Sequence, residues 1–209
     1  MKAILFDLDG VLVDACEWHY LSLNRALKEV VGFTINREDH NSTYNGLPTK
    51  VKLKILEVNE EQSKKIWKLK QNYTIDIIKE NGKKQDEKIE LLEYLKDNKI
   101  KIACVTNSIT KTTLEMLRIT NQLKYFNTII TNEHVENNKP HPECYNLAVK
   151  KLDIKPNDCI IVEDSLKGIQ AATSSVVPES NIWSVKNATE VTLNNFRRFI
   201  NENFDTNGG

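Results

Sequence analysis

The chain has 209 residues, of which 40% are hydrophobic and 28% are charged, close to soluble globular averages and unlike disordered, collagen-like or membrane-spanning chains. This length allows one well-buried domain with room for a smaller inserted one. The 29 basic and 29 acidic residues cancel without forming a long block of either sign, so we expect no nucleic-acid partner.

The N-terminal segment and the cysteines indicate the compartment. Only four apolar residues, 3–6, precede Asp7, which is too few for a signal-peptide core or a membrane span. The cysteines lack Cys-x-x-Cys spacing and stand far apart, at Cys16, Cys104, Cys144 and Cys159. We therefore expect reduced thiols, a cytoplasmic location and no membrane partner.

Apolar runs typical of buried strands alternate with helical patterns along most of the chain. The first run, 2–6, opens into a polar loop, as a buried parallel strand does. Similar runs follow at 100–105, 128–131, 158–162 and 181–185, with helical patterns that include 88–98 and 110–120. The alternation predicts a doubly wound, Rossmann-like α/β domain with a mainly parallel sheet.

Residues 15–82 interrupt this alternation. They show helical patterns at 18–31, 51–57 and 60–79, and a polar loop at 41–50. We expect a small helical cap domain at 15–82, inserted into a core domain made of 1–14 and 83–209.

Polar segments stand at or just beyond the ends of four predicted strands. If the sheet is parallel, these segments meet at one rim, where ligands bind in such folds. The four segments are Asp7-Leu8-Asp9-Gly10, Thr106-Asn107-Ser108, Lys139-Pro140 and Glu163-Asp164-Ser165.

The chemistry of this rim indicates a metal and a phosphate. Clustered carboxylates repel one another unless a cation lies among them. Oxygen ligands without thiolates or imidazoles are typical of a hard ion, which points to Mg²⁺. The hydroxyl, the amide donors at a helix start and the lysine suit the oxygens of a phosphoryl group.

The spacing of the first pair of acids also suits phosphoryl transfer. Residues two apart in an extended segment point the same way, so Asp7 and Asp9 can face one reacting centre. Gly10 then leaves space for the chain to turn away.

Residues 1–14 and roughly 83–175 resemble the haloacid dehalogenase superfamily in these motifs. The helical insertion after the first strand is similar to the first cap subclass, which includes β-phosphoglucomutase. The resemblance implies that Asp7 is a nucleophile that becomes an aspartyl phosphate, and that Asp9 is the acid/base. It also implies that Thr106, the Asn107 amide and Lys139 hold the phosphoryl group.

The same resemblance implies the metal ligands. Glu163 and Asp164, together with the Asp7 side chain and the Asp9 carbonyl, would hold Mg²⁺.

Four residues of the predicted cap are candidates for substrate contacts. His19 lies on the first cap helix, near where the family often has a histidine, although a satisfied helix-face histidine fits equally. Asn45, Gly46 and Lys50 lie where related caps carry a substrate-selecting loop. An ordinary interhelical turn with a solvated lysine is the alternative interpretation.

The cap loop also bears on the choice of reaction. In β-phosphoglucomutase-like sequences it usually continues Gly-x-Ser-Arg, whereas Pro48 and Thr49 stand here. Because an arginine suits a second phosphate clamp, its absence favours a phosphatase over a phosphomutase. The expected substrate is a small phosphorylated metabolite, with sugar phosphates among the candidates.

Two further alternatives fit less well. A dehalogenase would need neither Asp9 nor the acidic pair at 163–164. A phospho-accepting receiver domain would carry its acceptor aspartate after a later strand and would lack the helical insertion. The sequence does not set the oligomeric state, with which a monomer is compatible.

Overall fold

The computed structural model describes residues 1–44 and 47–204. The chain divides into two compact units, which are described separately below. The α/β unit comprises Met1–Asp14 and Lys83–Gly209, and the helical unit comprises Ala15–Gly82.

The α/β unit is built on a five-stranded sheet in the order β3-β2-β1-β4-β5, in which every neighbouring pair is parallel. The central strand β1 pairs on both sides, so that Leu5 lies opposite Ala103 and Ile161. The prediction of a parallel α/β fold is confirmed. The strands are β1 (Ala3–Phe6), β2 (Lys101–Val105), β3 (Thr128–Ile130), β4 (Cys159–Glu163) and β5 (Ile182–Ser184).

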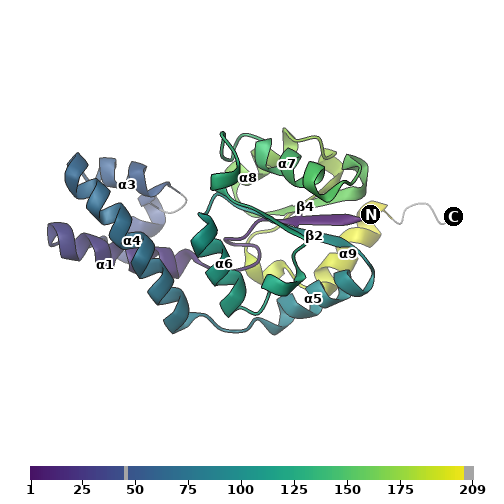
Figure 1. The fold of residues 1–209 in the computed structure, drawn as a ribbon, viewed down its shortest axis with the longest axis horizontal. Coiled ribbons are helices and arrows are strands. Elements are labelled where there is room, and N and C mark those ends of the chain that lie inside the picture. The colour runs from purple at the N-terminus through teal and green to yellow at the C-terminus, as the bar shows by residue number, and fades with distance from the viewer. Residues whose placement is uncertain (45–46, 205–209) are drawn as a thin grey trace. The chain divides into compact units, whose positions relative to one another are not determined.

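Helices cover both faces of this sheet (Figure 1). On one face α7 (Glu143–Leu152) contacts β1, β2 and β3, and α8 (Leu166–Thr173) contacts β4 and β5. On the other face α5 (Asp86–Asp97) packs against β2 and α9 (Leu193–Phe204). Since both faces are covered, the strands carry almost continuous apolar runs, which is why they could be predicted.

The remaining helical segments of the α/β unit are short connections or flank the sheet. The helix predicted at 110–120 is present as α6 (Thr110–Ile119). Single turns of 3₁₀-helix occur at Leu123–Tyr125, Asn132–His134, Pro156–Asp158, Glu179–Asn181 and Ala188–Glu190.

The helical unit is held together by the pairing of its two long helices, α1 (Cys16–Val31) and α4 (Glu60–Asn81), with α3 (Thr49–Ile55) packed beside α4. Helix α1 ends at Gly32, whose φ of 78° is left-handed. Helix α4 begins after Asn59, whose side chain accepts a hydrogen bond from the Gln62 amide. Their shared core contains Leu23, Ala26, Leu27, Leu53 and Ile66.

The polar loop predicted at 41–50 is partly helical, so that prediction was wrong in part. A short α2 (Arg37–Asp39) runs into a π-helical turn, η1 (His40–Tyr44), and α3 already begins at Thr49. The buried His40 ring packs edge-on against Tyr20 at 4.8 Å, and this tertiary contact holds the turn against α1. Residues 45 and 46 lie outside the described residues.

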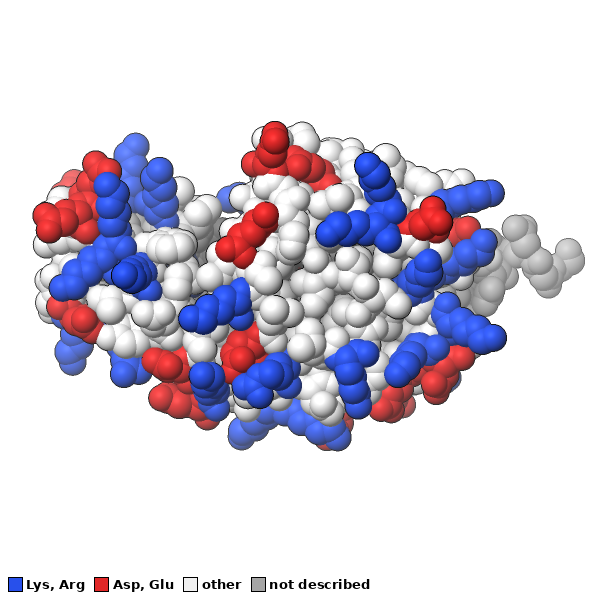
Figure 2. Space-filling view, viewed as in Figure 1, with Lys and Arg blue, Asp and Glu red and all other residues white. Residues whose placement is uncertain are grey.

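No helix in the described ranges is long and apolar enough to cross a membrane. On the face shown in Figure 2, basic and acidic side chains are interspersed.

Candidate active site

Asp7 and Asp9 leave the sheet at the end of its central strand. The Asp7 amide donates to the Val162 carbonyl (3.0 Å), which extends the pairing of β1 with β4 by one residue. The chain then turns tightly, because the Gly10 amide donates to the Val13 carbonyl (2.8 Å). Gly10 adopts a φ of 88°, a conformation that glycine allows and other residues rarely adopt.

Lys139 joins three strand ends through one ammonium group. Its Nζ donates to Asp7 Oδ1 (2.6 Å), to Glu163 Oε1 (2.6 Å) and to the Val105 carbonyl (2.8 Å). The side chain is 3% exposed. A buried ammonium between two buried carboxylates fixes all three groups in position.

Tyr145, on α7, completes this network and was not identified from the sequence. Its hydroxyl donates to Glu163 Oε1 (2.7 Å) and accepts from Lys139 Nζ (3.0 Å). In the sequence Tyr145 is simply one apolar position of a helix, so only the contact with the fully buried Glu163 reveals its role.

Two glycines make room for the acidic pair after β4. A Cβ built on Gly10 would lie 2.0 Å from Asp164 Oδ2, and one on Gly168 would lie 1.9 Å from Glu163 Oε1. Both contacts are far closer than real Cβ atoms show. The sequence suggested only a turn at Gly10, and it gave no signal for Gly168.

The acids after β1 and β4 fit a divalent cation. Carboxylate oxygens of Asp7, Glu163 and Asp164 lie within 4.8 Å of one another. Asp164 Oδ1 is buried and has no hydrogen-bond partner, as expected of an oxygen that coordinates a metal ion. With Asp9 these groups number four carboxylates against the single ammonium of Lys139, so the donor set suits Mg²⁺.

Burial and mutual repulsion shape the electrostatics of the site. Burial raises the pKa of Asp7 well above its usual range, although the Lys139 ammonium opposes the rise. Burial, followed by the nearby Glu163 carboxylate, raises the pKa of Asp164 to about 6. Burial acts to lower the pKa of Lys139, but Asp7 and Glu163 outweigh it and hold that pKa well above its ordinary value. A bound cation would favour the ionised carboxylates.

The segment after β2 lies beside these groups. The Asn107 side chain accepts from the Lys139 amide (3.0 Å) and donates to the Lys139 carbonyl (3.2 Å), so it fixes the backbone that carries the ammonium. Thr106 is 2% exposed, and its hydroxyl oxygen accepts from the Ser108 amide (3.0 Å). The predicted site residues of the α/β unit therefore lie at one edge of the sheet. They are Asp7, Asp9, Thr106, Asn107, Lys139, Glu163 and Asp164.

The residues of the helical unit that were predicted to contact substrate differ from one another in burial and contacts. Half-buried His19 contacts Lys70, with 3.2 Å between Nδ1 and Nζ. Lys50 is exposed. Lys52, which the sequence did not distinguish from its neighbours, is 7% exposed. Asn45 and Gly46 lie outside the described residues.

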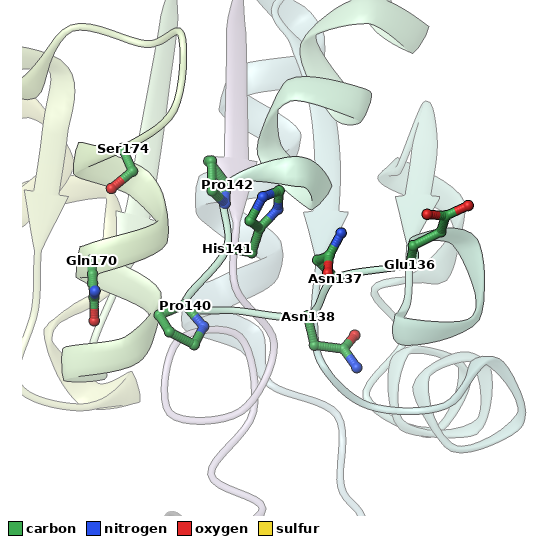
Figure 3. Close-up of a pocket in the computed structure, with 8 residues that line it drawn as sticks. All are labelled: Glu136, Asn137, Asn138, Pro140, His141, Pro142, Gln170 and Ser174. Carbon is green, nitrogen blue, oxygen red and sulfur yellow. The ribbon is translucent and has the colours of Figure 1, made fainter.

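A surface pocket of about 540 Å³ lies beside the segment that carries Lys139 (Figure 3). Six of its lining residues come from the connection between β3 and α7, one comes from α8, and one is the residue that directly follows α8. None of the predicted site residues lines it. Its lining is Glu136, Asn137, Asn138, Pro140, His141, Pro142, Gln170 and Ser174.

Comparison with known proteins decides the family. The model of the haloacid dehalogenase-like hydrolases matches residues 4–179. The chain belongs to this family. A phosphorylated carbohydrates phosphatase of Thermotoga maritima is 32% identical over 181 residues, which cover 84% of this chain and 82% of that protein.

Other relatives of this hydrolase are named for a different reaction. The β-phosphoglucomutase of Bacillus subtilis is 28% identical over 185 residues, which cover 84% of this chain and 80% of that protein. The structure of a β-phosphoglucomutase from Clostridium difficile superimposes with a TM-score of 0.73 at 27% identity, covering 97% of this chain and 98% of that chain. The resemblance to the haloacid dehalogenase superfamily is thus confirmed, and the chain is an enzyme of its phosphatase and phosphomutase branch.

Proposed function

We propose that this hydrolase is a Mg²⁺-dependent phosphatase that acts on a small phosphorylated metabolite, with sugar phosphates as the first class to test. The observation that carries the proposal is the junction of Asp7, Lys139 and Glu163 beside the unpartnered oxygen of Asp164. The named relative that acts on phosphorylated carbohydrates supports the choice of substrate class. A cytoplasmic location stays a prediction of the sequence.

Asp7 and Asp9 perform the two chemical steps in this proposal. An Asp7 carboxylate oxygen attacks phosphorus, and the bond to the leaving oxygen breaks as Asp9 gives that oxygen its proton. Asp9 then takes a proton from a water molecule, whose oxygen attacks the aspartyl phosphate. Phosphate departs, and the Asp7 carboxylate is restored.

The surrounding groups position the phosphoryl group and offset its charge. The Thr106 hydroxyl and the Asn107 backbone amide would donate to the phosphoryl oxygens, and the Lys139 ammonium, which contacts Asp7, would help to hold the group by offsetting its negative charge. Asp7, Glu163 and Asp164, with the Asp9 carbonyl, would hold Mg²⁺. When bound, Mg²⁺ neutralises charge that develops on the transferring oxygens.

The helical unit, residues 15–82, is proposed to be the cap that selects the substrate. Its proposed contact residues remain His19, Asn45, Gly46 and Lys50. The absence of Ser-Arg at positions 48 and 49 favours hydrolysis, because Pro48 and Thr49 cannot form a bidentate clamp on a second phosphate.

A phosphomutase is the second candidate, and the β-phosphoglucomutase relatives favour it. Both reactions use Asp7 and Asp9, so only the products separate them. Phosphatase activity releases inorganic phosphate, whereas a mutase forms an isomeric sugar phosphate without net release.

The experiment that tests the proposal is a phosphate-release screen with Mg²⁺ over sugar phosphates, nucleotides and phosphorylated acids. Asp7→Asn is the control and should abolish release, as should chelation of Mg²⁺. Isomer formation without net phosphate release would reject the phosphatase in favour of the mutase. Full activity of Asp7→Asn would reject the proposed chemistry for both.

A further inference from the structure

Ser108 makes a hydrogen bond that the proposed mechanism does not yet use. Its hydroxyl donates to Asp9 Oδ2 at 2.8 Å, across 99 residues of sequence. The bond therefore joins the loop after β2 to the turn after β1, at the proposed acid/base group.

The backbone on each side of this hydrogen bond is fixed. The Ser108 amide donates to the Thr106 hydroxyl oxygen (3.0 Å), and its carbonyl accepts from the Asn132 amide (3.3 Å). On the other side, Asp9 precedes the tight turn closed by the Gly10 amide. A hydroxyl held in this way meets one particular oxygen of the Asp9 carboxyl group.

We propose that Ser108 is a positioning residue that orients the Asp9 carboxyl group for proton transfer to the leaving oxygen. The inference rests on the proposed function, in which Asp9 is the acid/base. A serine hydroxyl suits this task, because it can donate to Oδ2 both when Asp9 carries its proton on Oδ1 and when the carboxyl group is ionised. It can therefore stay in contact with Asp9 through both steps.

The orientation has a defined chemical consequence. With Oδ2 held by Ser108, the transferable proton is carried on Oδ1 of Asp9. In the first step the Oδ1–H bond breaks and the proton passes to the leaving oxygen as its bond to phosphorus breaks. The Ser108 hydroxyl then donates to the carboxylate that this step produces.

The dependence on the leaving group separates this role from a structural one. Phenyl phosphate and p-nitrophenyl phosphate have similar shapes, but p-nitrophenolate departs readily without a proton, whereas phenolate benefits from one. The kcat/KM reports only the steps up to leaving-group departure, so hydrolysis of the aspartyl phosphate does not enter it. A misoriented acid should therefore affect phenyl phosphate selectively.

The experiment measures kcat/KM of the Mg²⁺-loaded enzyme for both esters in wild type, Ser108→Ala, Ser108→Cys and Ser108→Thr. Ser108→Ala should lower the value about tenfold or more for phenyl phosphate and less than about threefold for p-nitrophenyl phosphate. Ser108→Cys, which keeps the size but is a weak donor, should show the same selectivity and serves if the alanine variant does not fold. Ser108→Thr keeps the hydroxyl and should restore activity.

Two controls separate failure of this inference from failure of the proposed function. Ser184→Ala, at an exposed position of β5, should leave both values unchanged. Wild-type activity of Asp7→Asn would mean that the proposed function itself is wrong. If Asp7→Asn is inactive but the alanine and cysteine variants lose equally on both esters, or on neither, Ser108 does not position Asp9.

Discussion

Lys139 provides the only ammonium that contacts both Asp7 and Glu163 in the described part of the chain. Replacing it by methionine would leave two buried carboxylates without their cation. We expect Lys139→Met to lose activity and to lower the free energy of unfolding of the metal-free protein by about 3–5 kcal/mol at neutral pH. Denaturant unfolding measures this loss, with the exposed Lys150→Met as control. Equal stabilities of the two variants would contradict the role of Lys139 in compensating the charge of Asp7 and Glu163.

The raised pKa of Asp164 makes metal binding depend on pH. Its pKa is about 6, against an ordinary 3.8, so the folded metal-free protein holds this proton more tightly than the unfolded chain. The resulting stabilisation is present below the ordinary pKa and is lost as the pH rises through about 6. Because Mg²⁺ requires the ionised carboxylate, its binding should tighten over the same window.

Thermal unfolding with and without Mg²⁺ checks this expectation. The increase in Tm caused by Mg²⁺ should be larger at about pH 7.5 than at about pH 5. Asp164→Asn should reduce this difference, whereas the exposed Asp97→Asn should preserve it. A Mg²⁺ effect that is equal at both pH values in wild type would contradict the role of Asp164.

At the residue scale, side chains just beyond the strands can be predicted from the sequence more readily than the partners of side chains inside helices. Asp7, Thr106 and Asp164 could be placed together because parallel strands bring their carboxyl ends to one edge. Tyr145 and Gly168 could not, since a helix position shows its partner only after packing. Nothing in the sequence distinguishes Tyr145 from an ordinary core aromatic.

At the scale of single elements, replacing Gly168 on α8 by alanine should have two opposite effects on stability. Alanine normally stabilises a helix by about 0.5–1 kcal/mol relative to glycine. Here its Cβ would lie 1.9 Å from Glu163 Oε1, and overpacking of this kind costs about 1–3 kcal/mol. The cost of the clash should therefore exceed the gain in helix propensity. We expect Gly168→Ala to be less stable than wild type and to bind Mg²⁺ more weakly.

Denaturant unfolding and Mg²⁺ titration of Gly168→Ala measure these effects. A variant that is more stable than wild type and binds Mg²⁺ normally would show that Glu163 has room to move.

Helices with a clear apolar periodicity in the sequence could be predicted, whereas segments that are held by tertiary contacts could not. The apolar periodicity of α1 and α4 is strong enough to predict both helices. The π-helical η1 has no such pattern, because the contact of His40 with Tyr20 supports it. This tertiary contact explains why residues 41–44, which were predicted to be a loop, are helical in the structure.

At the scale of the whole molecule, the carboxylates of the proposed metal site all belong to the α/β unit. Binding of Mg²⁺ should therefore slow hydrogen exchange most in β1 and β4, and least in α1 and α4 of the helical unit. Exchange measured by mass spectrometry with and without Mg²⁺ tests this. Equal protection of α4 and β4 would contradict a site confined to the α/β unit.

The alternation of strands and helices predicts a parallel sheet, but it does not give the strand order. Strand β1 pairs with β2 and β4, which lie about a hundred or more residues along the chain. Such pairing depends on tertiary packing, which a local pattern does not contain.

The central claim is that Asp7 becomes an aspartyl phosphate. Asp9→Asn retains the nucleophile but lacks the base for hydrolysis, so p-nitrophenyl phosphate with Mg²⁺ should leave the phosphoryl group on the protein. Mass spectrometry of peptides from this variant should find one added phosphoryl group on Asp7, which disappears when Asp7→Asn is added. Phosphate on another residue, or turnover by Asp7→Asn with no phosphorylated protein, would contradict the account.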